Sequence, residues 1–421
     1  MATVSGTTTA PKPNGRIAFT YPSFVLYQLA RFCVVLATEM QSVAVGWQVY
    51  EITNRTLDLG LIGLAQFLPG IIFLPLSGHV ADRYNRSKVL TVGYVGLGIC
   101  SALLLAITVH GARTVYPIYV VIGLVGVARS FTGPASRAIL PLIVPEEHFE
   151  SAFAWGATFF EVATILGPAV GGVVYTIFRG PGAVYAVAMA GGVAAAVAMS
   201  RVKLTPRKKA VEILNWKTVF AGLHYIWREK IVLGSISLDL FAVLLGGAVA
   251  LLPAYARDIL HTGPWGLGLL RCAPAVGAGI MALILTYRPL GKRAGLKMLW
   301  CVAGFGVCTI LFGVSHSLAL SLAALVFVGA TDMVSVVVRG ILIQLRTPDE
   351  MRGRVNAVDM VFIGASNELG AFESGVTANW LGTVPAVVLG GIGTLVVTVL
   401  WAWMFPDLRN ADELVTPRRK P

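Results

Sequence analysis

Charged residues are scarce in this chain of 421 residues. Only 13% of the residues are Asp, Glu, Lys or Arg, whereas 56% are hydrophobic, and the mean hydropathy is +0.76. A typical soluble domain carries about 25% charged residues. The composition therefore excludes an ordinary water-soluble domain.

Cysteine is also rare, and the motifs of several enzyme classes are missing. The five cysteines are odd in number and lie inside apolar segments, which favours packing over disulfides or metal binding. The sequence has no Gly-x-x-x-x-Gly-Lys-Ser/Thr loop for ATP, no paired Asp-rich metal motif and no nucleophile placed with a His. We therefore expect neither an enzyme nor an ATP-driven pump, and neither a cofactor nor a metal site.

Long apolar runs dominate the sequence. A membrane-spanning helix needs about 20 mostly apolar residues, and twelve such runs follow one another: 23–49, 58–81, 88–109, 114–138, 151–177, 182–202, 230–254, 264–287, 295–315, 318–343, 354–380 and 383–405. They are too long for strands and lack the alternation of a membrane barrel. We predict an all-α integral membrane protein with twelve transmembrane helices.

The distribution of basic residues predicts the orientation of these helices. If the N-terminus is cytoplasmic, 26 of the 33 Lys and Arg residues fall on the inner side. Only Arg55, Arg113, Arg179 and Arg257 fall in outer loops. Short loops rich in Lys and Arg stay in the cytoplasm, so we expect both termini to be cytoplasmic. The net charge of +12 then reflects the orientation of the helices, and it also suits contact with the anionic lipids of the inner leaflet. We expect no nucleic-acid partner.

An internal repeat divides the chain in two. Pro145, Gly167 and Gly172 recur about 203 residues later as Pro348, Gly370 and Gly375. Six helices per copy is an even number, so both copies enter the membrane from the same side. We therefore expect a cytoplasmic tail at 1–20, a six-helix bundle at 21–202, a linker at 203–229, a second six-helix bundle at 230–406 and a cytoplasmic tail at 407–421. The tail at 1–20 lacks the apolar core of a signal peptide.

The linker is basic and contains aromatic residues. Arg207, Lys208, Lys209, Trp216 and Trp227 predict a short amphipathic helix along the inner membrane surface. The alternative is a calmodulin-like or lipid-controlled switch.

The loop after the second run carries a recognisable motif. Gly78-x-x-x-Asp82-Arg83-x-Asn85-Arg86 resembles the signature loop between helices 2 and 3 of the major facilitator superfamily. Asn85 stands where that family usually has Gly, and Asn is among the few other residues that tolerate a left-handed backbone. The resemblance implies the major facilitator fold, with two pseudo-symmetric six-helix bundles, and transport by alternating access.

Asp82, Arg83 and Arg86 are predicted to form a gate at the cytoplasmic mouth. In this hypothesis their charges hold one bundle against the other when the transporter is open to the outside. The alternative is a topology anchor, but Asp82 adds nothing to anchoring and is costly near apolar surface unless it is paired. The equivalent loop of the second half, 287–293, lacks an acid. We therefore expect the partner of Asp82 within 339–354.

Two further motifs lie in the first half. Gly167-Pro168-x-x-Gly171-Gly172 resembles the antiporter motif of drug and metabolite exporters in this superfamily. Its Pro removes a backbone hydrogen bond and bends the helix, while its glycines allow close helix packing. Ordinary small-residue packing is the alternative.

Arg129 belongs to a partial superfamily motif in which an Arg is associated with proton transfer, although Thr132 replaces the usual Gln. Its repeat equivalent in the second half is Asp332. We expect Arg129 and Asp332 to face one cavity; the alternative is that Arg129 extends toward the inner surface.

Buried acids are the candidates for coupling transport to protons. Those inside apolar runs are Glu39, Glu161, Asp239, Asp332, Glu368 and Glu373. Helices 1, 4, 7 and 10 line the central cavity in this fold, so Glu39 and Asp239 rank first and Asp332 next. The alternative for each is a structural ion pair, for instance with Arg31 or Arg271.

A narrower resemblance concerns the substrate. Glu39, Trp47, Tyr50 and Thr53, together with Asn-Glu-Leu-Gly at 367–370, resemble the enterobactin-exporter-like branch of the superfamily. That branch implies a multi-pass protein of the bacterial inner membrane that exports a siderophore-like or drug-like molecule in exchange for protons. We expect a monomer whose partners are the lipid bilayer, protons and a small molecule. A facilitator or importer on the same fold is the alternative, and dependence on the proton gradient distinguishes them.

Overall fold

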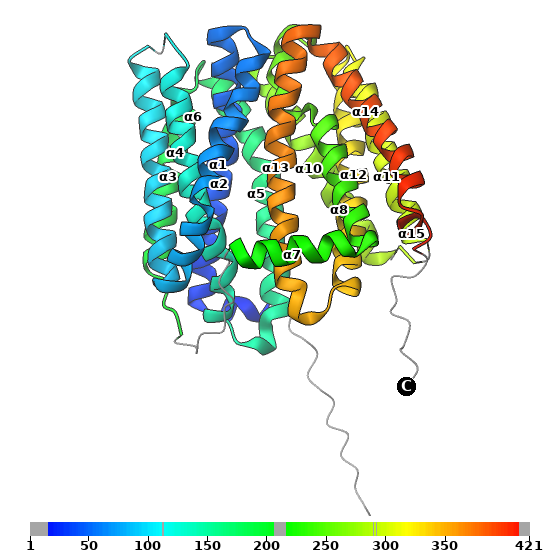
Figure 1. Cartoon of the computed structure of the whole chain (residues 1–421). Coiled ribbons are helices and arrows are strands. Elements are labelled where there is room, and N and C mark those ends of the chain that lie inside the picture. The colour runs from blue at the N-terminus through cyan, green and yellow to red at the C-terminus, as the bar shows by residue number, and fades with distance from the viewer. Residues whose placement is uncertain (1–15, 112, 206–215, 289, 292, 412–421) are drawn as a thin grey trace, which may run out of the picture.

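The chain is built of long helices that run side by side (Figure 1). The computed structural model describes residues 16–111, 113–205, 216–288, 290–291 and 293–411, and within these ranges it contains no strand. One helix, α7 (Trp216–Arg228), lies across one end of the bundle (Figure 1). We call this end the α7 end and the opposite end the far end. The first and last described helices, η1 (Ile17–Thr20) and α15 (Pro406–Arg409), lie at the α7 end (Figure 1).

Twelve long helices form the two halves. The first half contains α1 (Pro22–Thr53), α2 (Thr56–Arg83), α3 (Arg86–Val109), α4 (Tyr116–Ile139), α5 (Phe149–Ile177) and α6 (Gly182–Ser200). The second half contains α8 (Lys230–Gly246), α10 (Gly263–Tyr287), α11 (Ala294–Gly313), α12 (Leu318–Arg346), α13 (Asp349–Leu381) and α14 (Thr383–Met404). Helix α1 packs on α5 and α6, and α3 on α4 and α6; in the second half α11 packs on α12 and α14. The predicted twelve-helix architecture in two six-helix halves is confirmed.

The helix surfaces suit a bilayer. Among the described residues, eleven helical segments are long and apolar enough to cross a membrane. Large apolar side chains such as Val92, Ile72, Val399 and Trp403 are exposed on the outside of the bundle, as expected when lipid rather than water surrounds them. Helix α13 is the most polar of the twelve; its Asp359 pairs with Arg339 of α12, and its Asn367 and Glu368 line the cavity described below.

The two halves meet along two helix pairs. Helix α5 packs against α10, and α2 packs against α13. A Cβ on Gly172 of α5 would lie 2.5 Å from the Pro264 carbonyl oxygen of α10, so only glycine permits this approach. Its repeat mate, Gly375 of α13, would place a Cβ 2.8 Å from Gly60 Cα of α2. The repeated glycines thus make equivalent contacts across the interface, which is the pseudo-symmetry expected from the sequence.

The seventh spanning segment is interrupted, unlike the continuous helix predicted at 230–254. Helix α8 ends at Gly246, and Gly247 leaves helical geometry with φ −72° and ψ 64°. The chain continues through the short turns η4 (Ala248–Leu251) and α9 (Leu252–Ala254) into a π-helical turn, η5 (Tyr255–Ile259). Adjacent glycines weaken a helix at this point, and the prediction overlooked them.

Asn85 also differs from the prediction. Its φ is −62° and its ψ is 118°, so the backbone is extended rather than left-handed. The side chain instead caps α3, because its Oδ1 accepts hydrogen bonds from the backbone N–H groups of Ser87 at 2.9 Å and Lys88 at 3.4 Å. An N-cap, not a left-handed turn, therefore explains Asn at this position.

Candidate functional site

A cavity of about 410 Å³, lined by apolar and several charged side chains, lies between the two halves. Helices α1, α2 and α4 of the first half line it, as do α10, α12, α13 and the interrupted segment around Gly247 in the second half. Its charged and amide side chains include Glu39, Gln66, Arg129, Arg271, Asp332 and Glu368. Cavities of about 300–1,000 Å³ are typical of sites for drug-sized ligands.

Charges from both halves meet in this cavity. Arg271 of α10 donates a hydrogen bond to the Ser42 hydroxyl of α1 at 2.5 Å and interacts electrostatically with Glu39 and Glu368. Glu368 of α13 accepts a hydrogen bond from Gln66 Nε2 of α2 at 3.4 Å. It also interacts electrostatically with Arg129 of α4. All of these contacts except that between Arg271 and Glu368 join the first half to the second, so any rearrangement of the halves must change them.

A second charged group lies within the second half. Arg339 of α12 forms ion pairs with Asp239 of α8 and, at 3.4 Å, with Asp359 of α13. Arg339 and Asp239 are only 3% and 6% exposed. Asp332 lies on α12 about two turns before Arg339, and it interacts electrostatically with Asp239 and Arg339. We call these four residues the Arg339 cluster.

The structure separates the predicted coupling residues into two groups. Glu39, Arg129 and Asp332 line the central cavity, so Arg129 and its repeat mate face the same space, and the Arg129 side chain is exposed. Asp239 does not line that cavity, because its carboxylate is turned to Arg339. Arg339 is one of the 26 basic residues counted on the inner side from the sequence, and it lies buried within α12 rather than in a loop.

Glu161 and Arg31 lie outside the central cavity. Glu161 is exposed on α5 toward the α7 end. Arg31 donates a hydrogen bond to the Gly156 carbonyl at 3.3 Å, and its guanidinium lies 5.1 Å from the centre of the Phe160 ring. Arg31 therefore joins α1 to α5 within the first half, and it pairs with none of the predicted acids among the described contacts.

Sequence reasoning ranked two cavity residues too low. Glu368 appeared among the buried acids but lies on the eleventh spanning helix, outside the set of helices expected to line the cavity. Arg271 appeared only as an ion-pair partner. Both could have been found from the sequence, because each is a charged residue within an apolar or small-residue segment. Glu368 lies on α13, which packs on α2, and Arg271 lies on α10, which packs on α5.

The predicted gate motif makes contacts within the first half. Arg86 Nη1 donates to the Ala138 carbonyl oxygen near the end of α4 at 3.0 Å. Gly78 is buried and Arg83 is exposed. The side chain of Asp82 lies outside the described part of the chain, as do the linker residues Arg207–Lys209, so the predicted partner of Asp82 stays a prediction.

The antiporter-like motif forms the tight core of the interface. A Cβ on Gly171 would lie 2.8 Å from Met40 Cα of α1, and one on Gly167 would lie 2.4 Å from Glu39 Cβ. Pro168 is buried inside α5, and its carbonyl oxygen faces Gly268 of α10. The motif therefore brings α5 against both α1 and α10 beside Glu39.

Contacts between the halves close the far end. The Tyr50 hydroxyl of α1 donates to the Asp258 carboxylate of η5. Arg257 donates to the Tyr50 carbonyl oxygen at 3.2 Å, and its guanidinium lies 5.7 Å from the Tyr50 ring centre. We call Tyr50, Arg257 and Asp258 the far-end latch.

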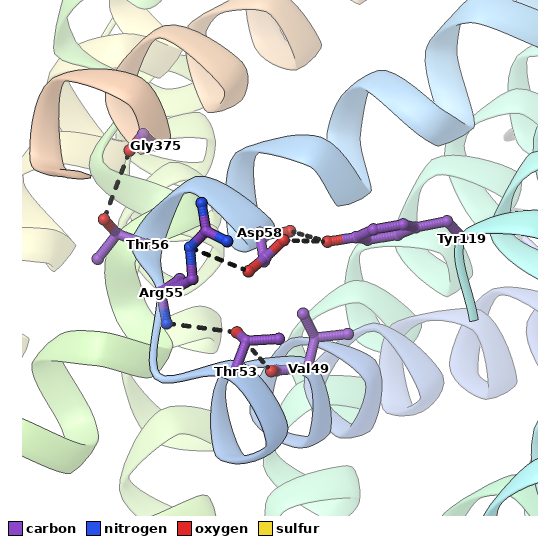
Figure 2. A network of polar contacts seen from close by, with 7 residues as sticks. All are labelled: Val49, Thr53, Arg55, Thr56, Asp58, Tyr119 and Gly375. Carbon is purple, nitrogen blue, oxygen red and sulfur yellow. Dashed lines mark hydrogen bonds and ion pairs between the residues drawn. The ribbon is translucent and has the colours of Figure 1, made fainter. Parts of the chain in front are cut away.

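The turn between α1 and α2 adds a second link, shown in Figure 2. Thr56 Oγ1 donates to the Gly375 carbonyl oxygen of α13 at 3.4 Å. Asp58 pairs with Arg55 at 3.9 Å and accepts a hydrogen bond from the Tyr119 hydroxyl at 2.8 Å (Figure 2). These contacts tie the turn to α4 as well, so it is held on both sides.

The α7 end is more open. On α5, the face that carries Pro168, Gly172 and Tyr175 is buried toward the far end. One and two heptads nearer the α7 end, the same face carries Glu161 and Ala154, and both are exposed. The contact between α5 and α10 is therefore lost toward the α7 end, while Arg137 of α4 still contacts Met360 of α13 between the halves.

Comparisons with known proteins agree with this architecture. Residues 18–419 match a family model described as transmembrane secretion effector. The enterobactin exporter EntS of Escherichia coli (strain K12) is 26% identical over 397 residues, which cover 93% of this chain and 94% of that protein. The structure of the nucleoside transporter NupG, 11% identical, covers 91% of this chain and 100% of that chain with a TM-score of 0.73. A D-xylose-proton symporter, 14% identical, covers 91% and 97% with a TM-score of 0.67. The chain therefore belongs to the transmembrane secretion effector family of major facilitator transporters.

Proposed function

We propose that this protein is a secondary active exporter that moves a small organic molecule out of the cytoplasm by alternating access, in exchange for protons. The observation that carries the proposal is the charged cavity between the halves, which is latched at the far end, while the face of α5 that contacts α10 becomes exposed toward the α7 end. A cavity with this access binds its ligand from one side and releases it to the other when the halves rock.

The α7 end is proposed to be cytoplasmic. Exposed basic residues gather in the loops at this end, including Arg83, Lys88, Arg201 and Arg288. Lys and Arg in short loops are retained on the cytoplasmic side. Both termini of the chain would then lie in the cytoplasm, and the exporter would sit in the bacterial inner membrane.

The proposed substrate is a siderophore-like or drug-like organic molecule. The cavity volume of about 410 Å³ suits such a ligand. Arg129 and Arg271 offer planar guanidinium groups, which stack on aromatic rings and bind acidic oxygens in pairs. The similarity to the enterobactin exporter EntS supports the same class, since enterobactin is the molecule that protein is named for.

Binding of enterobactin to purified protein in lipid nanodiscs tests this assignment. We expect Arg271→Gln to weaken binding by at least about tenfold, because a hydrogen bond to a charged group contributes about 1.5–3 kcal/mol. Arg201→Gln, at an exposed site at the end of α6, is the matched control and should bind as the wild type does. Equal affinity of wild type and Arg271→Gln would remove Arg271 from the binding site.

A further inference from the structure

A second, much smaller void lies beside the central cavity. Its volume is about 10 Å³, and its polar lining consists of Asp239, Thr331, Asp332 and Ser335. Asp332 lines both this void and the central cavity. Val243 and Phe305 also line both, so Asp332 is the polar side chain shared by the two spaces and the member of the Arg339 cluster that faces the cavity.

Ser335 points to a missing hydrogen-bond partner in this void. The residue is 1% exposed, and its Oγ has no hydrogen-bond partner among the described residues. Thr331, one turn earlier, satisfies its own hydroxyl by donating to the Phe327 carbonyl oxygen at 2.8 Å. A buried hydroxyl without a partner is costly and rare, so a water molecule is the natural occupant.

The void has the size and polarity that one water needs. A single water requires about 10–15 Å³ and two to four polar partners. The two carboxylates and two hydroxyls supply them. The void is too small for an organic ligand, and within the described residues no three His, Cys, Asp or Glu side chains gather as a metal site.

Charge in the Arg339 cluster is unbalanced. Three carboxylates, those of Asp239, Asp332 and Asp359, surround the single guanidinium of Arg339. Buried charges without partners are strongly unfavourable in a low-dielectric interior, so the cluster favours a bound proton. The other charged groups that face Asp332 lie across the central cavity on α1, α4, α10 and α13, and they are Glu39, Arg129, Arg271 and Glu368.

We propose that the void holds one water molecule that passes a proton from Asp332, at the wall of the central cavity, to Asp239. The proton leaves the Asp332 carboxyl for the water while the water gives one to the Asp239 carboxylate. Neutral Asp239 no longer attracts Arg339, which keeps only its ion pair with Asp359. The ion pair between Asp239 of α8 and Arg339 of α12 is thereby weakened, while the ion pair between Arg339 and Asp359 of α13 remains. This inference rests on the proposed function only in that the same proton drives export.

Infrared spectroscopy of the full-length protein in lipid vesicles tests the proton site without a transported substrate. In the wild type we expect the C=O stretch of a protonated carboxyl group near neutral pH. Asp332→Asn should remove that band, and Ser335→Ala should shift its frequency because the hydrogen-bonded water is disturbed. Asp407→Asn, an exposed acid at the α7 end, should leave it unchanged. A band that survives in Asp332→Asn and Asp239→Asn, or that responds to Na⁺ instead of pH, would overturn the proposal.

Transport by the same variants separates this inference from the proposed function. With enterobactin as the probe in proteoliposomes, Asp332→Asn should lose uptake driven by a pH gradient but keep exchange of labelled for unlabelled enterobactin. Size-exclusion chromatography first establishes that the variant is folded. If the wild type exchanges no enterobactin, the proposed substrate fails while the infrared result still decides the proton site. Gradient-driven uptake by Asp332→Asn at the wild-type rate contradicts the relay.

Discussion

At the scale of single residues, burial decides what a charge does. Arg339 falls in the sequence among charges that predict a cytoplasmic loop, yet it is buried between Asp239 and Asp359. The pairing could not be predicted, because Asp239 and Arg339 are about 100 positions apart and nothing in their spacing brings them together. Glu39, Arg129 and Asp332 could be placed in the cavity, since a charge within an apolar helix needs an aqueous space or a partner.

The first prediction concerns the stability that Arg339 provides. Arg339→Gln leaves buried carboxylates without their guanidinium, and removing one partner of a buried pair costs about 3–5 kcal/mol. We expect a clearly lower melting temperature of the purified protein in detergent. Adding Asp239→Asn to that variant should recover part of the loss. A single variant as stable as the wild type would contradict the burial of this pair.

The second prediction distinguishes the two explanations of Asn85. If Asn85 acts as an N-cap, Asn85→Ala should lower the free energy of unfolding by about 0.5–2 kcal/mol, and Asn85→Gly by only a few tenths of a kcal/mol. Asn85→Asp retains the accepting oxygen and should behave as the wild type does. Thermal unfolding of the three variants measures this order. A gain in stability for Asn85→Gly would instead support the left-handed turn expected from the motif.

At the scale of helices, periodic apolar runs predicted the elements well. The ends of α3, α5 and α10 lie within a few residues of the predicted limits, since charged residues such as Arg86, Glu150 and Arg288 lie close to these ends. The break after Gly246 was missed because a hydrophobic run conceals a change in backbone geometry. Conversely, 354–380 was counted among the twelve apolar runs, yet α13 is not among the eleven described segments that are apolar enough to cross a membrane by composition.

The third prediction concerns the contact between α5 and α10. Gly172→Leu would force these helices apart, and overpacking costs about 1–3 kcal/mol. We expect less folded protein or loss of far-end closure, measured by size-exclusion chromatography and by accessibility of cysteines introduced at the far end. Gly279→Leu on α10 is the matched control, since a Cβ there meets no atom within 4 Å. Equal effects of both substitutions would argue against the close approach at Gly172.

At the scale of the whole molecule, the two ends of the cavity differ. The far end is closed by the latch and by the link between Thr56 and Gly375, while α5 loses its contact with α10 toward the α7 end. No sequence pattern predicted this state, because both states of an alternating-access transporter use the same sequence and differ by a few contacts.

The fourth prediction is that the far-end latch sets the balance between these states. Tyr50→Phe removes the hydroxyl that donates to Asp258, and a hydrogen bond to a charged group contributes about 1.5–3 kcal/mol. The population open at the far end should therefore rise. Spin labels at Arg179 and His316, both at the far end, should move apart, and labels at Arg201 and Arg288 at the α7 end should approach. Unchanged distance distributions would show that the latch does not control closure.

The central claim is that a proton gradient drives a small organic molecule through the cavity from the α7 end to the far end. The most direct measurement is uptake of enterobactin into inverted membrane vesicles, in which the cytoplasmic face points outward. We predict uptake when the vesicle interior is acidic, its abolition by a protonophore, and its loss in Glu368→Gln but not in Asp407→Asn. Uptake that continues after the gradient is collapsed would instead identify a facilitator and contradict the account.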